Sequence, residues 1–191
     1  AAGAVDRAGR GRGGLGRRRR EVAGPMRVHA SGEAHRRPGR PHHLTARDLE
    51  RQAPGQRVAV VTLDLERFAA LNDGFGHETG DQILVAVAAS FDRLPEAVVA
   101  ASRIGSDTYA LLVVAADPEQ EVTEVTDQSR ESLRGLLLAD GREIEIGFHA
   151  GYVVSDPVAG RTAEWHLEAA DLALARSRSS RHARLVGYSD D

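Results

Sequence analysis

The fold is decided by Asp64-Leu-Glu-Arg-Phe-Ala-Ala-Leu-Asn-Asp-Gly-Phe-Gly-His-Glu-Thr-Gly-Asp81, read together with Arg103-Ile-Gly-Ser-Asp-Thr-Tyr109. The first stretch places two acids at the end of an apolar run. A helical turn, an Asn-Asp-Gly break and the start of a second helix follow them. The second stretch is a short polar turn between two apolar runs, which is typical of a β-hairpin. Together they predict a strand, two helices and a hairpin.

Outward from these stretches, apolar periodicity predicts the neighbouring elements. Residues 57–65 form a nearly continuous β-branched run, which favours a buried strand. Residues 81–93 predict a helix, and residues 98–104 and 109–115 predict the two hairpin strands. The residues expected on the inner stripe of the helix are Ile83, Leu84, Val87, Ala88 and Phe91.

The flanking regions complete an alternating pattern. A short helix is expected over 46–52, a long one over 119–138 and a last one over 162–179. Residues 144–154 predict one strand or a bent hairpin around Gly147 and Gly151, and residues 184–188 a short closing strand. The inward residues expected on the long helix are Val122, Val125, Ser129, Leu133, Leu136 and Leu137. The resulting order indicates an α/β (α+β) fold, a split βαβ sheet with helices packed on it.

Composition bounds the class of protein. A chain of 191 residues with 41% apolar residues fits one ordinary domain plus a tail. It has no cysteine, which excludes disulfides and thiolate zinc sites. No apolar run approaches the length of a membrane span, and the start lacks the order of a signal peptide. We therefore expect a soluble cytoplasmic protein.

Charge divides the chain into two parts. Residues 1–43 carry 11 Arg and 3 acids, about +8, whereas the other 148 residues carry 14 Arg and 25 acids, about −11. The first part is rich in Arg and Gly and has no periodicity, so we expect a disordered arm over 1–43 and a folded domain over 44–191. The arginines could contact nucleic acid or anionic lipid. The alternatives are a solvated tail, or a mature protein that begins at Met26.

Two aspartates point to a metal-bound phosphate. Asp64 lies at the exit of the first predicted strand, and Asp107 lies in the hairpin turn. The two would face each other if those strands are neighbours in the sheet. Mg²⁺ prefers a few carboxylates together with phosphate oxygens. The pair is therefore suited to hold a metal-bound triphosphate.

The first stretch resembles the GGDEF (diguanylate cyclase) family of bacterial signalling domains. That family has D-x-D-x-F-K-x-x-N-D-x-x-G-H-x-x-G-D, and residues 64–81 keep its spacing. The family's Arg-x-Gly-Gly-Asp/Glu-Glu-Phe corresponds to residues 103–109, and a looser C-terminal motif corresponds to residues 170–183. The resemblance covers about residues 44–189. It implies a nucleotide-cyclase-like, mostly antiparallel central sheet flanked by helices.

The resemblance also implies a role for individual residues. Asn72 and Asp81 would bind the guanine edge, and an Asp there discriminates against adenine. Asp64, the Leu65 carbonyl and Asp107 would hold Mg²⁺, with Asp107 as the residual catalytic acid. The residues expected at the phosphates of GTP are Gly105, Ser106 and Arg178.

The departures from the family pattern are concentrated at the phosphates. Ala69 replaces a phosphate-binding Lys, Thr108 replaces a Glu, and His182 replaces an Arg. Ser106 replaces the second Gly of the hairpin, where a primed turn needs a positive φ that costs a non-glycine residue about 1 kcal/mol. Each lost charge at such a site costs about 10²–10³ in rate. Guanine recognition is thus kept, whereas phosphate activation is damaged.

Three functions follow from this asymmetry. The first is a degenerate signalling domain, catalytically inactive, that binds GTP or GDP or a protein partner. The second is a weakly active diguanylate cyclase, in which two copies face each other and join two GTP molecules with Mg²⁺. The third is an interaction scaffold with a vestigial pocket. The family's Arg-x-x-Asp product-inhibition motif is missing at residues 96–99, so cyclic di-GMP binding by that route is not expected.

Overall fold

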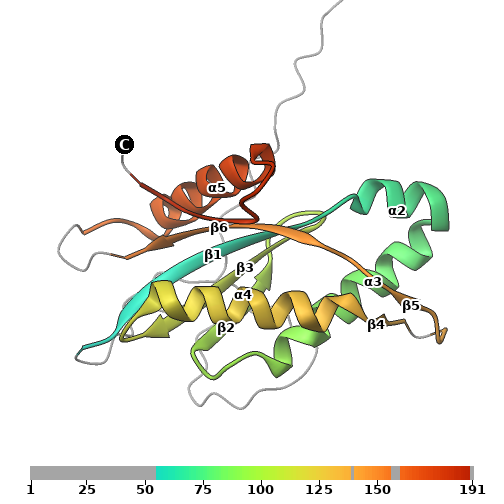
Figure 1. Cartoon of the computed structure of the whole chain (residues 1–191), viewed down its shortest axis with the longest axis horizontal. Coiled ribbons are helices and arrows are strands. Elements are labelled where there is room, and N and C mark those ends of the chain that lie inside the picture. The colour runs from blue at the N-terminus through green and yellow to red at the C-terminus, as the bar shows by residue number, and fades with distance from the viewer. Residues whose placement is uncertain (1–54, 139, 156–159, 190–191) are drawn as a thin grey trace, which may run out of the picture.

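Strand β1 (Arg57–Leu65) is the middle strand of the main sheet, and its bounds match the predicted strand. The computed structural model describes residues 55–138, 140–155 and 160–189. The expected arm (1–43) and the helix expected over 46–52 lie outside the described residues. β1 is buried along nearly its whole length because helices cover both faces of the sheet (Figure 1).

The main sheet has five strands in the order β2-β3-β1-β6-β7. Its other strands are β2 (Val98–Arg103), β3 (Thr108–Ala115), β6 (Phe148–Val154) and β7 (Leu185–Gly187). All neighbours are antiparallel except β6 and β7, which are parallel. The predicted hairpin is β2–β3, and the predicted mostly antiparallel sheet is confirmed.

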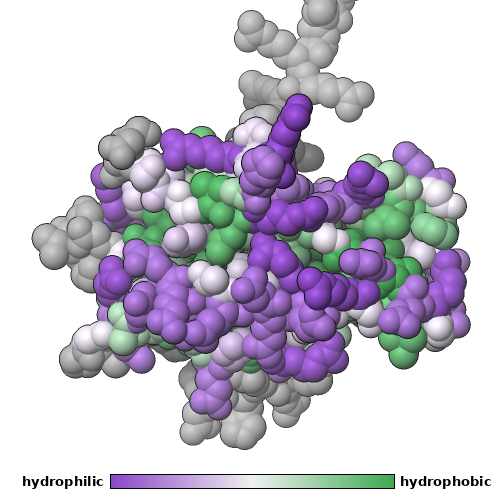
Figure 2. Space-filling model, in the orientation of Figure 1, coloured by the Kyte–Doolittle hydropathy of each residue, from purple (hydrophilic) through white to green (hydrophobic). Residues whose placement is uncertain are grey.

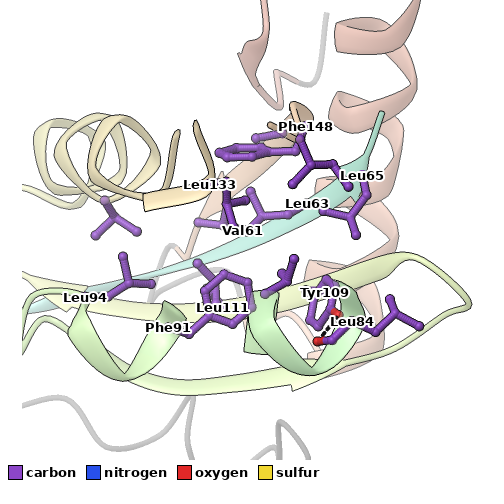
Figure 3. Close-up of a cluster of buried hydrophobic side chains, with 14 of the residues drawn as sticks. Val61, Leu63, Leu65, Leu84, Phe91, Leu94, Tyr109, Leu111, Leu133 and Phe148 are labelled. Carbon is purple, nitrogen blue, oxygen red and sulfur yellow. Dashed lines mark hydrogen bonds between the residues drawn. The ribbon is translucent and has the colours of Figure 1, made fainter. Parts of the chain in front are cut away.

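The helices form one layer on each face of the sheet. α3 (His77–Ser90), a 3₁₀ turn (Phe91–Arg93) and α4 (Pro118–Arg134) cover one face, and α5 (Ala163–Ser179) covers the other. Alternate residues of β1 serve the two layers: Val61 and Leu63 pack with α3 and α4, and Val58 and Val60 pack with α5. Figure 3 shows the first of these layers, with the Tyr109 hydroxyl donating to the Leu84 carbonyl at 3.1 Å.

Four expectations about elements and residues are corrected. The helix expected over 119–138 ends at Arg134, and the following β4 (Leu136–Leu137) pairs with β5 (Glu143–Ile144). Leu137 is therefore exposed rather than inward, because successive strand residues face opposite ways. Ala88 is exposed on α3, one position away from the buried stripe. The segment expected over 144–154 divides into β5 and β6, which belong to different sheets.

Helix α2 (Phe68–Phe75) follows β1 and meets α3 at one end of the molecule. Phe68 is buried, but Phe75 is 57% exposed at the end of α2. Figure 2 shows hydrophobic surface gathered at this end, where α2, α3 and β4 lie, and a largely hydrophilic surface over α4. Within the described residues, no helix is long and apolar enough to cross a membrane.

Candidate functional site

The end of β1 and the β2–β3 turn lie side by side. Asp64 is paired with Thr108 across the β1–β3 ladder, and the Leu65 N–H donates to the Asp107 carbonyl at 3.1 Å. The two aspartates therefore meet at one edge of the sheet, because β1 and β3 are neighbours. This is the juxtaposition that the sequence predicts for Asp64 and Asp107.

Asp64 lies between β3 and the last turn of α5. Its Oδ1 accepts a hydrogen bond from the Thr108 hydroxyl at 3.1 Å and forms an ion pair with the Arg178 guanidinium. The Asp64 side chain is 16% exposed and that of Arg178 is 48% exposed. Burial raises the pKa of the Asp64 carboxyl above its ordinary 3.8, and the charge of Asp107 adds to this; Arg178 and Thr108 act in the opposite direction.

The hairpin turn differs from the one expected. Ser106 does not have a positive φ, so the predicted backbone strain there is wrong. The loop has four residues (104–107), and the Thr108 carbonyl accepts from the N–H groups of both Ile104 and Gly105. A four-residue loop closes around ordinary backbone angles, whereas a two-residue primed turn does not. Serine is therefore tolerated at this position.

Side chains fix the shape of this turn. Arg103 donates from Nε to the Gly105 carbonyl at 3.0 Å and from Nη2 to the Ser106 carbonyl at 2.8 Å. The Ser106 hydroxyl donates to Asp107 Oδ1 at 2.8 Å. The hydroxyl of Ser106 and one oxygen of Asp107 are thus engaged with each other at the edge of the site.

The residues expected at guanine lie on α2 and α3. Asn72 lies in the second turn of α2, and its Oδ1 is buried without a hydrogen-bond partner. A Cβ built on Gly80 would overlap that oxygen, so Asn72 lies directly against the first turns of α3. Asp81, the next residue, is exposed on α3. The structure thus brings Asn72 to the residue that precedes Asp81.

A second charged cluster lies beside Asp64, and sequence reasoning missed it. Glu66 forms an ion pair with Arg184, and His149 Nε2 lies 3.6 Å from the same carboxylate. His149 is paired with Asp64 across the β1–β6 ladder, and its Nδ1 lies 3.3 Å from the Ser177 hydroxyl. Spacing along the chain could not reveal these contacts, because the residues come from three distant segments.

The acid pair does not fit a bound Mg²⁺ as it stands. Mg²⁺ needs free oxygen ligands in octahedral geometry. Oδ1 of Asp64 already has two donors, and one oxygen of Asp107 accepts from Ser106. Among the described residues, no group of three acidic or histidine side chains is placed to hold a metal. A metal at Oδ1 of either aspartate would have to displace Thr108 and Arg178 from Asp64 or Ser106 from Asp107.

Comparisons with known proteins identify the relatives of this arrangement. Residues 42–184 match the family model described as diguanylate cyclase, GGDEF domain. The chain is 34% identical over 130 residues, 68% of its length, to an uncharacterized signaling protein of Caulobacter vibrioides, and 34% identical over 91 residues, 46% of its length, to the diguanylate cyclase VdcA of Vibrio cholerae. These matches cover 16% and 26% of the two relatives, so the chain spans a minor part of their length.

The fold has solved relatives as well. The GGDEF domain of YfiN (TpbB) from Pseudomonas aeruginosa superimposes with a TM-score of 0.65 at 25% identity. The match covers 76% of this chain and 91% of that domain. The sheet order and helix layers described above are therefore those of a known domain.

Proposed function

The chain belongs to the GGDEF domain family of diguanylate cyclases, and from this premise we propose that it is a signalling domain that binds GTP or GDP with little or no cyclase activity. One observation carries the proposal: Asn72 Oδ1 is buried and has no hydrogen-bond partner. An unpaired buried acceptor costs about 1–3 kcal/mol, which a ligand donor would offset once the Asn72 carboxamide turns toward it. The N–H and amino groups of guanine are donors of the required kind.

The surrounding residues support guanine rather than adenine. Gly80 leaves the space that the Asn72 carboxamide fills, and Asp81 follows it with an exposed carboxylate. A carboxylate accepts from both the ring N–H and the amino group of guanine, whereas adenine presents an unprotonated nitrogen there. In this proposal Gly105, Ser106 and Arg178 contact the phosphates.

The residues expected near the phosphates indicate that catalysis is weak. Thr108 supplies a hydroxyl where the family resemblance implies an acid, and that hydroxyl is bound to Asp64. Ala69 is exposed and offers no charge to a phosphate. Loss of fixed charges that stabilise a transition state lowers the rate far more than it lowers ground-state binding. The domain would then act through a signalling protein that reads its nucleotide state.

Calorimetric titration with GTP, GDP and ATP tests this function. We expect GTP to bind at least about tenfold more tightly than ATP, because the wrong base leaves Asn72 and Asp81 unpaired. Asp81→Ala should remove the preference, and Asp92→Ala, an exposed acid in the 3₁₀ turn, should keep it. Equal affinity for GTP and ATP in the folded protein would contradict the proposal.

A second candidate is a slow diguanylate cyclase, which the meeting of Asp64 and Asp107 at one sheet edge favours. This function requires a homodimer, with two GTP sites facing each other, and Mg²⁺ held by Asp64, Leu65 and Asp107. Mass spectrometry of long incubations with GTP tests it. Cyclic di-GMP that is formed by the unaltered chain and absent with Asp107→Ala would establish this activity.

A further inference from the structure

We propose that the Arg178 guanidinium replaces a divalent cation as the counter-ion of Asp64, beside Asp107. The proposal deepens the proposed function, because it states how a nucleotide site of this family would work without its metal. Its first test needs no nucleotide, so the two proposals fail independently.

Asp64 Oδ1 is already occupied by two donors. A carboxylate oxygen has two lone pairs, and here both have a donor. These donors are the Thr108 hydroxyl and the Arg178 guanidinium. A metal ion at this oxygen would have to displace a charged donor. The Thr108 hydroxyl cannot compensate, since it is neutral and already faces Asp64 at 3.1 Å.

Arg178 is held in position by the residue that precedes it in α5. The preceding residue, Ser177, is fully buried, and its hydroxyl donates to the Ala183 carbonyl at 3.2 Å. The last turn of α5 is thereby tied to the chain that follows it. The backbone at Arg178 is held over the end of β1, and its side chain reaches Asp64 from a defined point.

The charges around Asp64 also disfavour a metal ion there. Glu66 is already paired with Arg184, so it does not compete for Arg178. Arg178 supplies one positive charge directly to Asp64, and Asp107 adds a second carboxylate nearby in the β2–β3 turn. A metal approaching this pair meets a carboxylate that is neutralised in part and a guanidinium that repels it. Arg is also the side chain best suited to bind phosphate directly.

The consequence for the proposed function is a change in how phosphates are held. Arg178 is half exposed, and its other guanidinium N–H groups can donate to an arriving phosphate while Nη2 stays on Asp64. Guanine nucleotides would then bind through the base and an arginine, with no requirement for Mg²⁺. This distinguishes the domain from a cyclase, whose chemistry needs the metal.

Electron paramagnetic resonance of Mn²⁺ without nucleotide tests the assignment. Arg178→Gln is expected to bind Mn²⁺ at least about tenfold more tightly than the unaltered chain, because the competing charge is gone. Arg176→Gln is the matched control on the same helix, since Arg176 contacts Ser189 and not the acids. The gained site should disappear in Arg178→Gln combined with Asp64→Asn.

Two outcomes would overturn the proposal. One is tight Mn²⁺ binding by the unaltered chain, equal to that of Arg178→Gln. The other is no gain in Arg178→Gln, which would mean that Arg178 is not what excludes the metal. In a second arm, GTP affinity is compared in Mg²⁺ and in EDTA, and we expect agreement within about twofold. Binding that needs Mg²⁺ also overturns the proposal, whereas absence of GTP binding in both buffers contradicts the proposed function alone.

Discussion

At the scale of single residues, the buried carboxylate of Asp64 lowers the free energy of unfolding at neutral pH. Its carboxyl is largely removed from water and has Asp107 nearby, and both effects raise its pKa above 3.8 despite Arg178 and Thr108. A group with a raised pKa in the folded state binds more protons there than in the unfolded chain. The free energy of unfolding therefore falls as pH rises from about 4 through the folded pKa. Such a cost is typical of residues kept for function.

Asp64→Asn is therefore predicted to stabilise the fold at neutral pH. The substitution removes the buried charge but also the ion pair with half-exposed Arg178, which contributes about 0–1 kcal/mol. We expect the melting temperature at pH 7 to rise by about 1–4 °C. The gap between the two proteins should shrink as the pH falls through the raised pKa of Asp64 and its carboxyl takes up a proton. Asp92→Asn is the exposed control, and a variant that is less stable at pH 7 would contradict the prediction.

At the scale of secondary-structure elements, local sequence patterns predicted those elements whose buried residues recur with regular spacing. β1 was fully predictable because its β-branched run is continuous, and the β2–β3 hairpin because its turn is short and polar. The end of α4 was not, because Leu136 continues the helical spacing of Leu133 and is buried too. The helix ends there because β4 pairs with β5, and this pairing cannot be predicted from the spacing of apolar residues.

The candidate site shows the same division. Asp64 and Asp107 could be placed together because motif spacing and strand adjacency are both readable from sequence. The contacts of His149 and Arg184 with Glu66 could not, because they depend on how β6 and β7 align with β1. The predicted strands already leave a four-residue loop, but the positive φ expected at Ser106 assumed a primed turn, which a loop of that length does not need.

The contact between α2 and α3 gives a prediction about Gly80. Replacing a helical glycine with alanine usually stabilises a protein by up to about 1 kcal/mol. Here the new Cβ would overlap Asn72 Oδ1, the end of a side chain that would have to turn away, so we expect Gly80→Ala to lose this gain and to destabilise the fold by up to about 1 kcal/mol. In an Asn72→Ala background the same change should be neutral or stabilising. Urea denaturation of the four proteins measures the coupling, and additive effects would show that the two residues are not in contact.

At the scale of the whole molecule, one close approach joins the α5 layer to the sheet. A Cβ on Gly151 of β6 would overlap the Ala170 carbonyl and the Leu174 N–H, and would lie 2.6 Å from Leu174 Cα. These are backbone atoms of α5, so no side chain can turn aside. α5 also carries Arg178, and the position of the guanidinium over Asp64 therefore depends on the absence of a side chain at residue 151.

Gly151→Ala should accordingly affect stability and the site together. We expect a loss of about 2–4 kcal/mol in the free energy of unfolding, because a helix must move away from the sheet. The single tryptophan, Trp165, lies on α5 and reports this movement by its fluorescence during urea denaturation. Gly74→Ala is the matched control, since a Cβ there meets no atom within 4 Å. Because α5 would shift, Mn²⁺ affinity should also rise as it does in Arg178→Gln. A Gly151→Ala protein as stable as the unaltered chain would show that α5 is not packed this closely, and the support for Arg178 from its helix would then be lost.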